Sequence, residues 1–309
     1  MIIKKVFIFA ATTVAAFILI ISVVCGVGDN ISIVVFNKFC NSININIDGE
    51  RWILGKIYCH LNPLNKIKEV VVGKRGSFKA SAKVNYITKE VLQIENYETR
   101  NKIFNKYNIS LDNRKIRNWP DLLSEQQAKQ IAFIYAQQIG LPLDVKFSHM
   151  SLDMAYTGTW IAHWIRMHNG YQYENDFLTI NIMAVNGEFY SYGKYYKGNP
   201  CKTEIKISKV DAIKISRDKV NSLINGNKTD LDVTKYIATS PELKIIQPNV
   251  MIGAFMPLHY SNSRLAWIIT YILPSNQDMH LVESGDFTEK IVIKVDAASG
   301  RIIGGNFSK

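Results

Sequence analysis

Alternation of hydrophobic and polar residues marks three hairpins that lie far apart in the chain. They occupy residues 82–97, 178–196 and 290–307, and each has two strand-like runs joined by a short turn. The turns are Thr88-Lys89, Asn186-Gly187 and Ser299-Gly300. Asn-Gly is the strongest hairpin signal of the three, because both residues tolerate positive φ. The pattern therefore predicts antiparallel sheet at three places.

A helical period of 3.6 precedes two of these hairpins. Residues 124–140 begin with Ser124 and Gln127, the pattern of a capping box. Residues 208–226 begin in the same way with Ser208 and Asp211. Apolar residues then recur on one face of each helix: Ala128, Ile131, Ala132, Tyr135 and Ile139 in the first, and Ala212, Ile213, Val220 and Leu223 in the second. Both segments are predicted to be amphipathic helices.

A strand containing Trp-Ile lies between each helix and its hairpin. The two strands are 160–170, with Trp164, and 265–273, with Trp267. The order helix, tryptophan strand, hairpin thus occurs twice, which predicts an internal duplication. Because each helix has one apolar stripe and each strand alternates, the predicted class is α+β, with one helix packed on an antiparallel sheet in each unit.

The second copy has Ala212 in the helix, Ala266-Trp267 in the strand and the stretch from Val295-Asp296-Ala297 to Gly300 and Ile302 in the hairpin. In these residues it resembles the PepSY domain. The tandem arrangement is similar to the YcdB/YcdC-type repeat proteins of bacteria. In the first copy Met183-Ala184-Val185-Asn186-Gly187 stands in place of the Asp-Ala turn, so its Asp is absent. Residues near 88 resemble a remnant of another copy.

The resemblance implies an extracytoplasmic module that binds or inhibits a protein partner such as a peptidase, and it brings no catalytic residue. Independently of the family, Asp296 is expected to accept hydrogen bonds from the turn amides. The tryptophans are expected to cover the core beneath each helix, and a sugar-stacking role is the alternative.

The N-terminal segment predicts a membrane anchor. Lys4-Lys5 precede residues 6–28, which carry no charge and are long enough to span a bilayer. Positive charge on the N-terminal side places the rest of the chain outside the cytoplasm. A cleaved signal near Gly26-Val27-Gly28 remains an alternative, as does a lipidated Cys25, although no small residue stands just ahead of that cysteine.

Export changes the interpretation of the cysteines. Cys40 and Cys59 would close a loop of a size at which a disulfide stabilises by about 3 kcal/mol, so they are predicted to pair and to leave Cys201 free. The cysteines have no CxxC spacing. His163 and His168 are five apart on a predicted strand and point to opposite faces, so no metal site is predicted.

Composition adds a second functional hypothesis. The chain has 309 residues and a formal net charge of +11, with lysines scattered rather than clustered. No nucleic-acid motif, Walker phosphate loop, GxSxG, HExxH or GxGxxG is present, so neither an enzyme nor a cofactor is predicted. The stretch 72–79, with three cations around two glycines, predicts an exposed hairpin turn or, alternatively, an anion cradle. Carboxylates such as Glu174 and Asp176 are available without a predicted cleft.

The predicted organisation is a signal anchor at 1–29, a β-rich region at 30–119 and PepSY-like units at 120–200 and 201–309. The preferred function is a membrane-anchored module for a protein partner. The alternative is a basic ectodomain that holds an anionic cell-envelope polymer or lipid headgroups.

Overall fold

The computed structural model describes residues 26–54, 66–74, 77–107, 109, 120–154, 157–226, 236–248, 262–272 and 290–308. It is an α+β protein, as predicted. The chain forms two compact units, one made of residues 1–164 and 178–195 and the other of residues 165–177 and 196–309. The expected PepSY-like units at 120–200 and 201–309 stay predictions.

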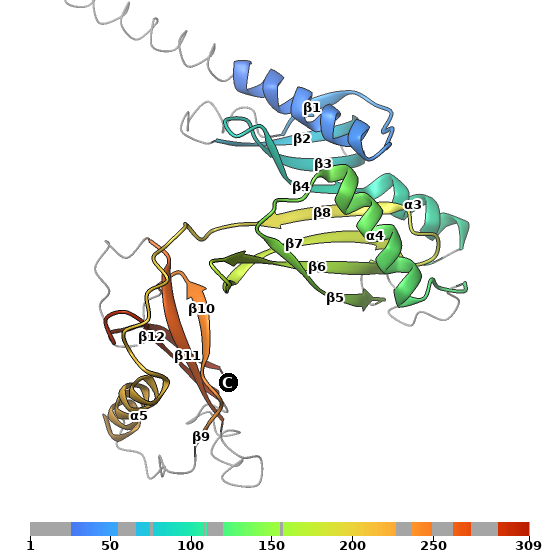
Figure 1. Ribbon diagram of the computed structural model, residues 1–309. Coiled ribbons are helices and arrows are strands. Elements are labelled where there is room, and N and C mark those ends of the chain that lie inside the picture. The colour runs from blue at the N-terminus through green and yellow to red at the C-terminus, as the bar shows by residue number, and fades with distance from the viewer. Residues whose placement is uncertain are drawn as a thin grey trace, which may run out of the picture. The chain divides into compact units, whose positions relative to one another are not determined.

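In the part of the chain that the structure describes, a helix followed by a four-stranded meander occurs three times (Figure 1). In the N-terminal repeat, a helix at residues 26–42 precedes β1 (Arg51–Ile53), β2 (Ile67–Lys74), β3 (Ser77–Asn85) and β4 (Glu90–Asn96). In the middle repeat, α4 (Glu125–Ile139) precedes β5 (Val145–Asp153), β6 (Thr159–His168), β7 (Tyr171–Met183) and β8 (Phe189–Tyr195). In the C-terminal repeat, α5 (Lys209–Gly226) precedes β10 (Glu242–Ile246), β11 (Arg264–Ile272), β12 (Lys290–Asp296) and β13 (Ile302–Ser308), with the short strand β9 (Ile237–Ala238) on β11.

The strands of each repeat pair in sequence order. The orders are β1-β2-β3-β4, β5-β6-β7-β8 and β10-β11-β12-β13. β4 also pairs antiparallel with β8, so the first two repeats share one sheet and one core. The remnant expected near residue 88 is therefore the final hairpin of a further repeat.

Each helix places a residue triplet with i, i+4, i+8 spacing against its sheet. The triplets are Ser32, Phe36 and Cys40, then Ala128, Ala132 and Ala136, then Ala212, Ser216 and Val220, and all nine residues are buried. Small side chains predominate in the second and third triplets, and they let the helix backbone approach the strands closely. Of these residues the sequence predicts Ala128, Ala132, Ala212 and Val220 on the buried faces, whereas Ala136 and Ser216 were not predicted there.

The start of each helix in the middle and C-terminal repeats is fixed to a hairpin turn. The Leu123 N–H donates to the Ala184 carbonyl at 2.8 Å, and the Ile207 N–H donates to the Ala297 carbonyl at 2.9 Å. The helices then begin alike, since Ser124 and Ser208 cap amides three residues ahead. The predicted capping box of Ser124 and Gln127 is present.

A tryptophan completes this junction, and it corrects the expected repeat alignment. Trp160 Nε1 donates to the Leu123 carbonyl at 2.9 Å, and Trp267 Nε1 donates to the Ile207 carbonyl at the same distance. The counterpart of Trp267 is therefore Trp160 and not Trp164. Both Trp160 and Trp164 are followed by isoleucine, so the dipeptide alone does not separate them. Trp164 instead packs against Phe133 and Phe147 in the core under α4.

Two features lie outside the repeat pattern. α3 (Tyr97–Lys106) follows β4 and packs through Ile103 and Phe104 against Met183 and Tyr190. The beginning of β7 pairs in parallel with β10, which makes the sheet of the C-terminal unit mixed and not purely antiparallel. The region expected to be β-rich thus also contains the helix at 26–42 and α3.

The predicted anchor and disulfide depend on residues outside the described part of the chain. Residues 6–25 and Cys59 are not described, and no helix among the described residues is long and apolar enough to cross a membrane. Cys40 is 3% exposed, and burial raises the pKa of its thiol to about 12. The anchor and the Cys40–Cys59 pair stay predictions.

Candidate binding cleft in the N-terminal repeat

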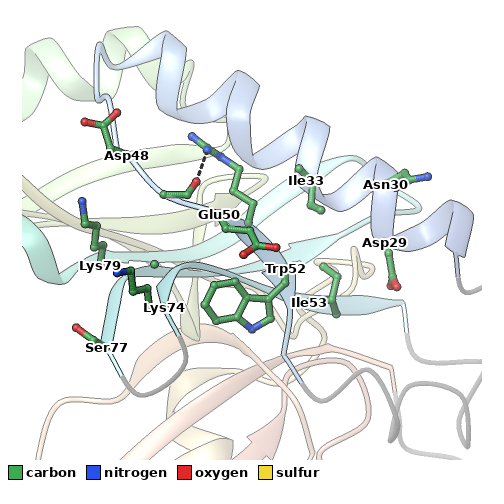
Figure 2. Close-up of a pocket in the computed structure, with 13 residues that line it drawn as sticks. Asp29, Asn30, Ile33, Asp48, Glu50, Trp52, Ile53, Lys74, Ser77 and Lys79 are labelled. Carbon is green, nitrogen blue, oxygen red and sulfur yellow. Dashed lines mark hydrogen bonds between the residues drawn. The ribbon is translucent and has the colours of Figure 1, made fainter.

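A cleft of about 920 Å³ lies between the first turns of the helix at 26–42, the strand β1 and the β2–β3 hairpin (Figure 2). Its size falls in the range of ligand sites, which is about 300–1,000 Å³. Its lining is Asp29, Asn30, Ile33, Asp48, Gly49, Glu50, Arg51, Trp52, Ile53, Gly73, Lys74, Ser77 and Lys79. All of these residues belong to one compact unit.

Two glycines allow the backbones around the cleft to approach closely. Gly49 has φ 144° and Gly73 has φ 127°, and the Gly73 N–H donates to the Glu50 carbonyl at 3.1 Å. A Cβ at Gly73 would lie 2.6 Å from the Ser77 carbonyl oxygen, and one at Gly49 would lie 3.2 Å from the Gly73 nitrogen. A side chain at either position would therefore push the cleft-lining segments apart.

The charged groups of the cleft have both signs. Asp29, Asp48 and Glu50 are carboxylates, and Arg51, Lys74 and Lys79 are cations. The Arg51 guanidinium is held in place, because it donates to the Gly49 carbonyl at 3.0 Å and to the Ile47 carbonyl at 3.2 Å. Lys79 also lies 3.6 Å from Glu98 of α3. The lining thus offers donors and acceptors without a dominant charge.

An aromatic side chain supplies the apolar wall. Trp52 stands on β1 with its ring half-buried, and it meets the Phe78 ring edge-on with centroids 5.8 Å apart. Figure 2 shows the indole between Lys74 and Ile53, along the wall of the cleft. A half-buried aromatic side chain in the wall of a cleft is suited to cover an apolar or cationic group of a ligand.

A buried ion pair supports the helix side of the cleft. Asp29 is 6% exposed, and its carboxylate lies 3.7 Å from the ammonium of Lys68, which is itself buried on β2. The Lys68 ammonium also lies 5.8 Å from the centre of the Tyr86 ring. Removing one partner of a buried pair costs about 3–5 kcal/mol, because the other charge stays desolvated. The pair therefore fixes where the helix begins to line the cleft.

The residues singled out from the sequence lie elsewhere, at the helix–sheet junctions. Gly187 and Gly300 occupy turns at φ 74° and 72°. Asp296 accepts from the Ala298 and Ser299 amides at 2.9 and 2.7 Å, while Asn186 accepts from the Glu188 amide at 3.1 Å. Trp164 and Trp267 pack in hydrophobic cores. These side chains build the repeats and do not line the cleft.

The carboxylates named from the sequence are bound in ion pairs of the C-terminal unit. Glu174 lies 2.6 Å from the Lys294 ammonium. Asp176 lies 2.8 Å from the Arg166 guanidinium and accepts hydrogen bonds from the Lys197 and Gly198 amides. Arg166 is stacked between the rings of Tyr173 and Tyr196, at 4.4 and 4.5 Å. Both carboxylates therefore have structural partners.

A stacked histidine pair was not foreseen from the sequence. His149 on β5 and His163 on β6 have ring centroids 4.4 Å apart and nearly parallel planes, and Ser151 is hydrogen-bonded to His163. Burial first, and the neighbouring His149 second, lower the pKa of His163. Among the described residues no group of three or more His, Cys, Asp or Glu could hold a metal ion.

The sequence contained one signal for the cleft, in the stretch 72–79. Its cations and glycines predicted an exposed hairpin or an anion cradle, and the structure places Gly73, Lys74, Ser77 and Lys79 in the cleft wall. The acidic side came from residues 29–50, in which no motif stands out. Only the contact between the helix and the β1–β3 strands brings the two groups together.

Comparison with known proteins assigns no family. No family model matches the sequence, and no curated protein matches it. Among solved structures, the C-terminal domain of YpeB from Bacillus megaterium aligns over 89% of this chain and 96% of that domain, with a TM-score of 0.45 and 9% sequence identity. A likeness of this size assigns neither a family nor a function, so the repeat architecture and the cleft rest on the geometry above.

Proposed function

We propose that this protein is a binding module of PepSY type that holds a segment of a protein partner in the cleft of its N-terminal repeat. The mixed lining of the cleft is the observation that supports a polypeptide ligand. A peptide presents backbone amides, carbonyls and charges of both signs, and the cleft offers three carboxylates and three cations beside Trp52. The resemblance of the C-terminal repeat to the PepSY domain suggests a peptidase as one such partner.

The same lining weighs against the alternative ligand at this site. An anionic polymer or a lipid headgroup would meet the exposed carboxylates of Asp48 and Glu50 as well as the cations. Sites for polyanions normally exclude carboxylates, because like charges repel at short range. The scattered basic surface of the chain remains the only support for polymer binding.

We also propose that residues 6–28 anchor the protein and that the rest faces outward from the cytoplasm. The support is Lys4-Lys5 ahead of an uncharged run. Protease added to intact spheroplasts is expected to degrade the chain beyond residue 30. Full protection of that part would refute the orientation.

The cleft is tested by capturing partners from solubilised membranes with the full-length protein as bait. Trp52→Ala and Lys74→Glu should each lose the partner that the wild type retains. Matched controls are Leu143→Ala and Lys106→Glu, which remove an exposed apolar residue and reverse an exposed charge outside the cleft. Equal loss with the controls, or none with the cleft variants, would contradict the proposal.

Salt distinguishes the two ligand classes. Binding of an anionic polymer should weaken steeply as the salt concentration rises, because exposed charges are screened over about 10 Å at 0.1 M. Binding in a cleft with balanced charges should weaken less. A steep decrease that is unaffected by Trp52→Ala would favour the polymer and reject the cleft.

A further inference from the structure

The strand β5 has an outer edge on which no described strand pairs. It spans Val145–Asp153 without a proline, and among the described strands it pairs with β6 alone. An open edge of this length presents a row of backbone N–H and C=O groups toward solvent. Such a row is the template on which a peptide can add as another strand.

The C-terminal repeat shows an extended segment on the same edge. β10 occupies the position in its repeat that β5 occupies in the middle repeat, since each is the first strand of its meander. Along the outer edge of β10 runs the beginning of β7, in parallel, with Lys244 opposite Gln172 and Ile245 opposite Tyr173. The first strand of this repeat type can therefore carry an added strand.

The side chains beside β5 form an apolar shelf with positive charge. Phe133 of α4 is 41% exposed, and its ring lies 5.1 Å from that of Phe147 on β5. The ammonium of Lys129, one turn before Phe133, lies 4.6 Å from the centre of the Phe147 ring. A strand added beside Phe147 would bury more of both rings and would place its own side chains next to Lys129.

Charge selects the occupant. Lys146 and Lys129 are exposed along this edge, whereas acidic residues occur only at its ends, as Asp144 and Asp153. Asp153 already accepts a hydrogen bond from Thr157. A second copy of β5 contains a single carboxylate, that of the terminal Asp153, so it offers little charge complementarity along this edge. An acidic segment with alternating apolar residues complements the shelf in both charge and period.

We propose that β5 binds an extended acidic segment of a partner protein by strand addition, with the segment's apolar side chains on Phe133 and Phe147 and its carboxylates near Lys146, on the opposite face of the strand. This site is separate from the cleft, so either can fail without the other. Backbone hydrogen bonds to β5 would hold the segment, and the shelf would set its preference for acidic and apolar residues.

The probe is a synthetic nine-residue peptide of alternating glutamate and valine, titrated into the full-length protein. Amide hydrogen exchange over residues 145–153 is expected to slow in its presence, because solvent-facing amides gain partners. Two N-methylated versions of this peptide serve as controls. In each, every second backbone nitrogen is methylated, which blocks the N–H groups on one edge of the extended peptide. The version that blocks the edge facing β5 should not bind, and the other should bind normally.

Side-chain variants test the shelf. Lys146→Glu and Phe133→Ala should each weaken binding of the peptide by about tenfold, the change that corresponds to about 1.4 kcal/mol. Controls are Lys38→Glu on the helix at 26–42 and Ile134→Ala, an exposed neighbour of Phe133, and neither should change the affinity. The cleft variant Trp52→Ala should also bind the peptide normally.

Three outcomes would overturn the proposal. One is the absence of slowed exchange at β5 with peptide present at millimolar concentration. Another is binding that both N-methylated peptides retain, because strand pairing is then not involved. The third is a concentration-dependent dimer that protects the same amides without peptide, which would make a second copy the occupant.

Discussion

The turns that close the middle and C-terminal repeats have the same backbone and different side chains. Met183 N–H donates to the Glu188 carbonyl and Asp296 N–H to the Arg301 carbonyl, both at 2.8 Å. Four residues later, the Gly187 N–H donates to the Met183 carbonyl and the Gly300 N–H donates to the Asp296 carbonyl. The Asp296 carboxylate adds two bonds to its turn, whereas the methionine cannot.

The corresponding turn of the N-terminal repeat has the side-chain cap but no glycine. Asn85 accepts from the Ile87 and Thr88 amides at 3.1 and 3.2 Å, as Asp296 does in its own turn. Lys89, at the position of the glycines, has φ 57°. Positive φ at the last turn position is therefore common to all three repeats, and the side-chain cap is common to two. The backbone shape is the requirement, and the cap strengthens it.

The largest expected effect comes from valine at the glycine positions. Both Gly187→Val and Gly300→Val place a β-branched residue at positive φ, which costs about 1–3 kcal/mol. At Gly187 a Cβ would also lie 2.5 Å from Ile131 Cδ1, whereas at Gly300 the nearest atom is 3.3 Å away. Urea denaturation should show the larger loss of unfolding free energy for Gly187→Val.

Gly140→Val is the control for this comparison. Gly140 has φ 72° and no atom within 4 Å of a built Cβ, so it reports backbone strain alone. Equal losses for Gly140→Val and Gly187→Val would show that the contact with the helix is unimportant.

Removing the side-chain cap should destabilise the C-terminal turn more than the N-terminal turn. Asp296→Ala loses two hydrogen bonds of about 1 kcal/mol each, in a side chain that is 5% exposed. Asn85→Ala loses two longer bonds in an exposed turn and should cost less. Thermal melts should therefore show the larger decrease for Asp296→Ala. An unchanged melting temperature for Asp296→Ala, with loss of some activity instead, would indicate a catalytic role.

Removing the tryptophan hydrogen bond at the start of a helix should cost less stability, and about equally in the middle and C-terminal repeats. Trp160→Phe and Trp267→Phe each remove an N–H donor from the carbonyl that precedes a helix, worth about 1 kcal/mol beyond the lost ring contacts. Trp164→Phe loses ring contacts without that bond and serves as the control. If Trp164→Phe and Trp267→Phe matched while Trp160→Phe differed, the original alignment of the repeats would be restored.

The smallest expected effect is a gain in stability. Lys89→Gly relieves a non-glycine residue at positive φ and should raise the free energy of unfolding by up to about 1 kcal/mol. Thr88→Gly, one residue earlier, gains no such relief and should lower it through chain entropy. A loss of stability in Lys89→Gly would mean that the lysine side chain supports the turn.

Local patterns predicted the elements whose signals are short in range. The capping box at Ser124, the serine cap at Ser208, the Asn-Gly turn and the alternating hairpins depend on neighbours within a few residues, and the structure contains all of them. The helix at 26–42 was missed because its run of Ile and Val fits a strand or the end of an anchor equally well. Burial of Phe36 and Cys40 against the sheet decides for the helix, and that contact cannot be seen in a local window.

The alignment of the repeats and the candidate sites depend on longer-range contacts. Trp160 and Trp164 are equivalent as dipeptides, and only the hydrogen bond to residue 123 distinguishes them. The cleft joins Asp29 to Lys74 and Lys79 across a helix and a hairpin, and the shelf joins α4 to β5. In each case the residues are distant in the sequence, and only the folded chain brings them close together.

The crossing of the β6–β7 hairpin between the two compact units has a consequence for dissecting the protein. The outer part of this hairpin, residues 165–177, belongs to the C-terminal unit, although the same strands continue into the other unit. A fragment cut at residue 196 would lack the strand segment beside β10 and the Arg166–Asp176 pair. The C-terminal unit is therefore not a single segment of the sequence, and a fragment that contains all of it has to begin at residue 165 and include residues 178–195 of the other unit.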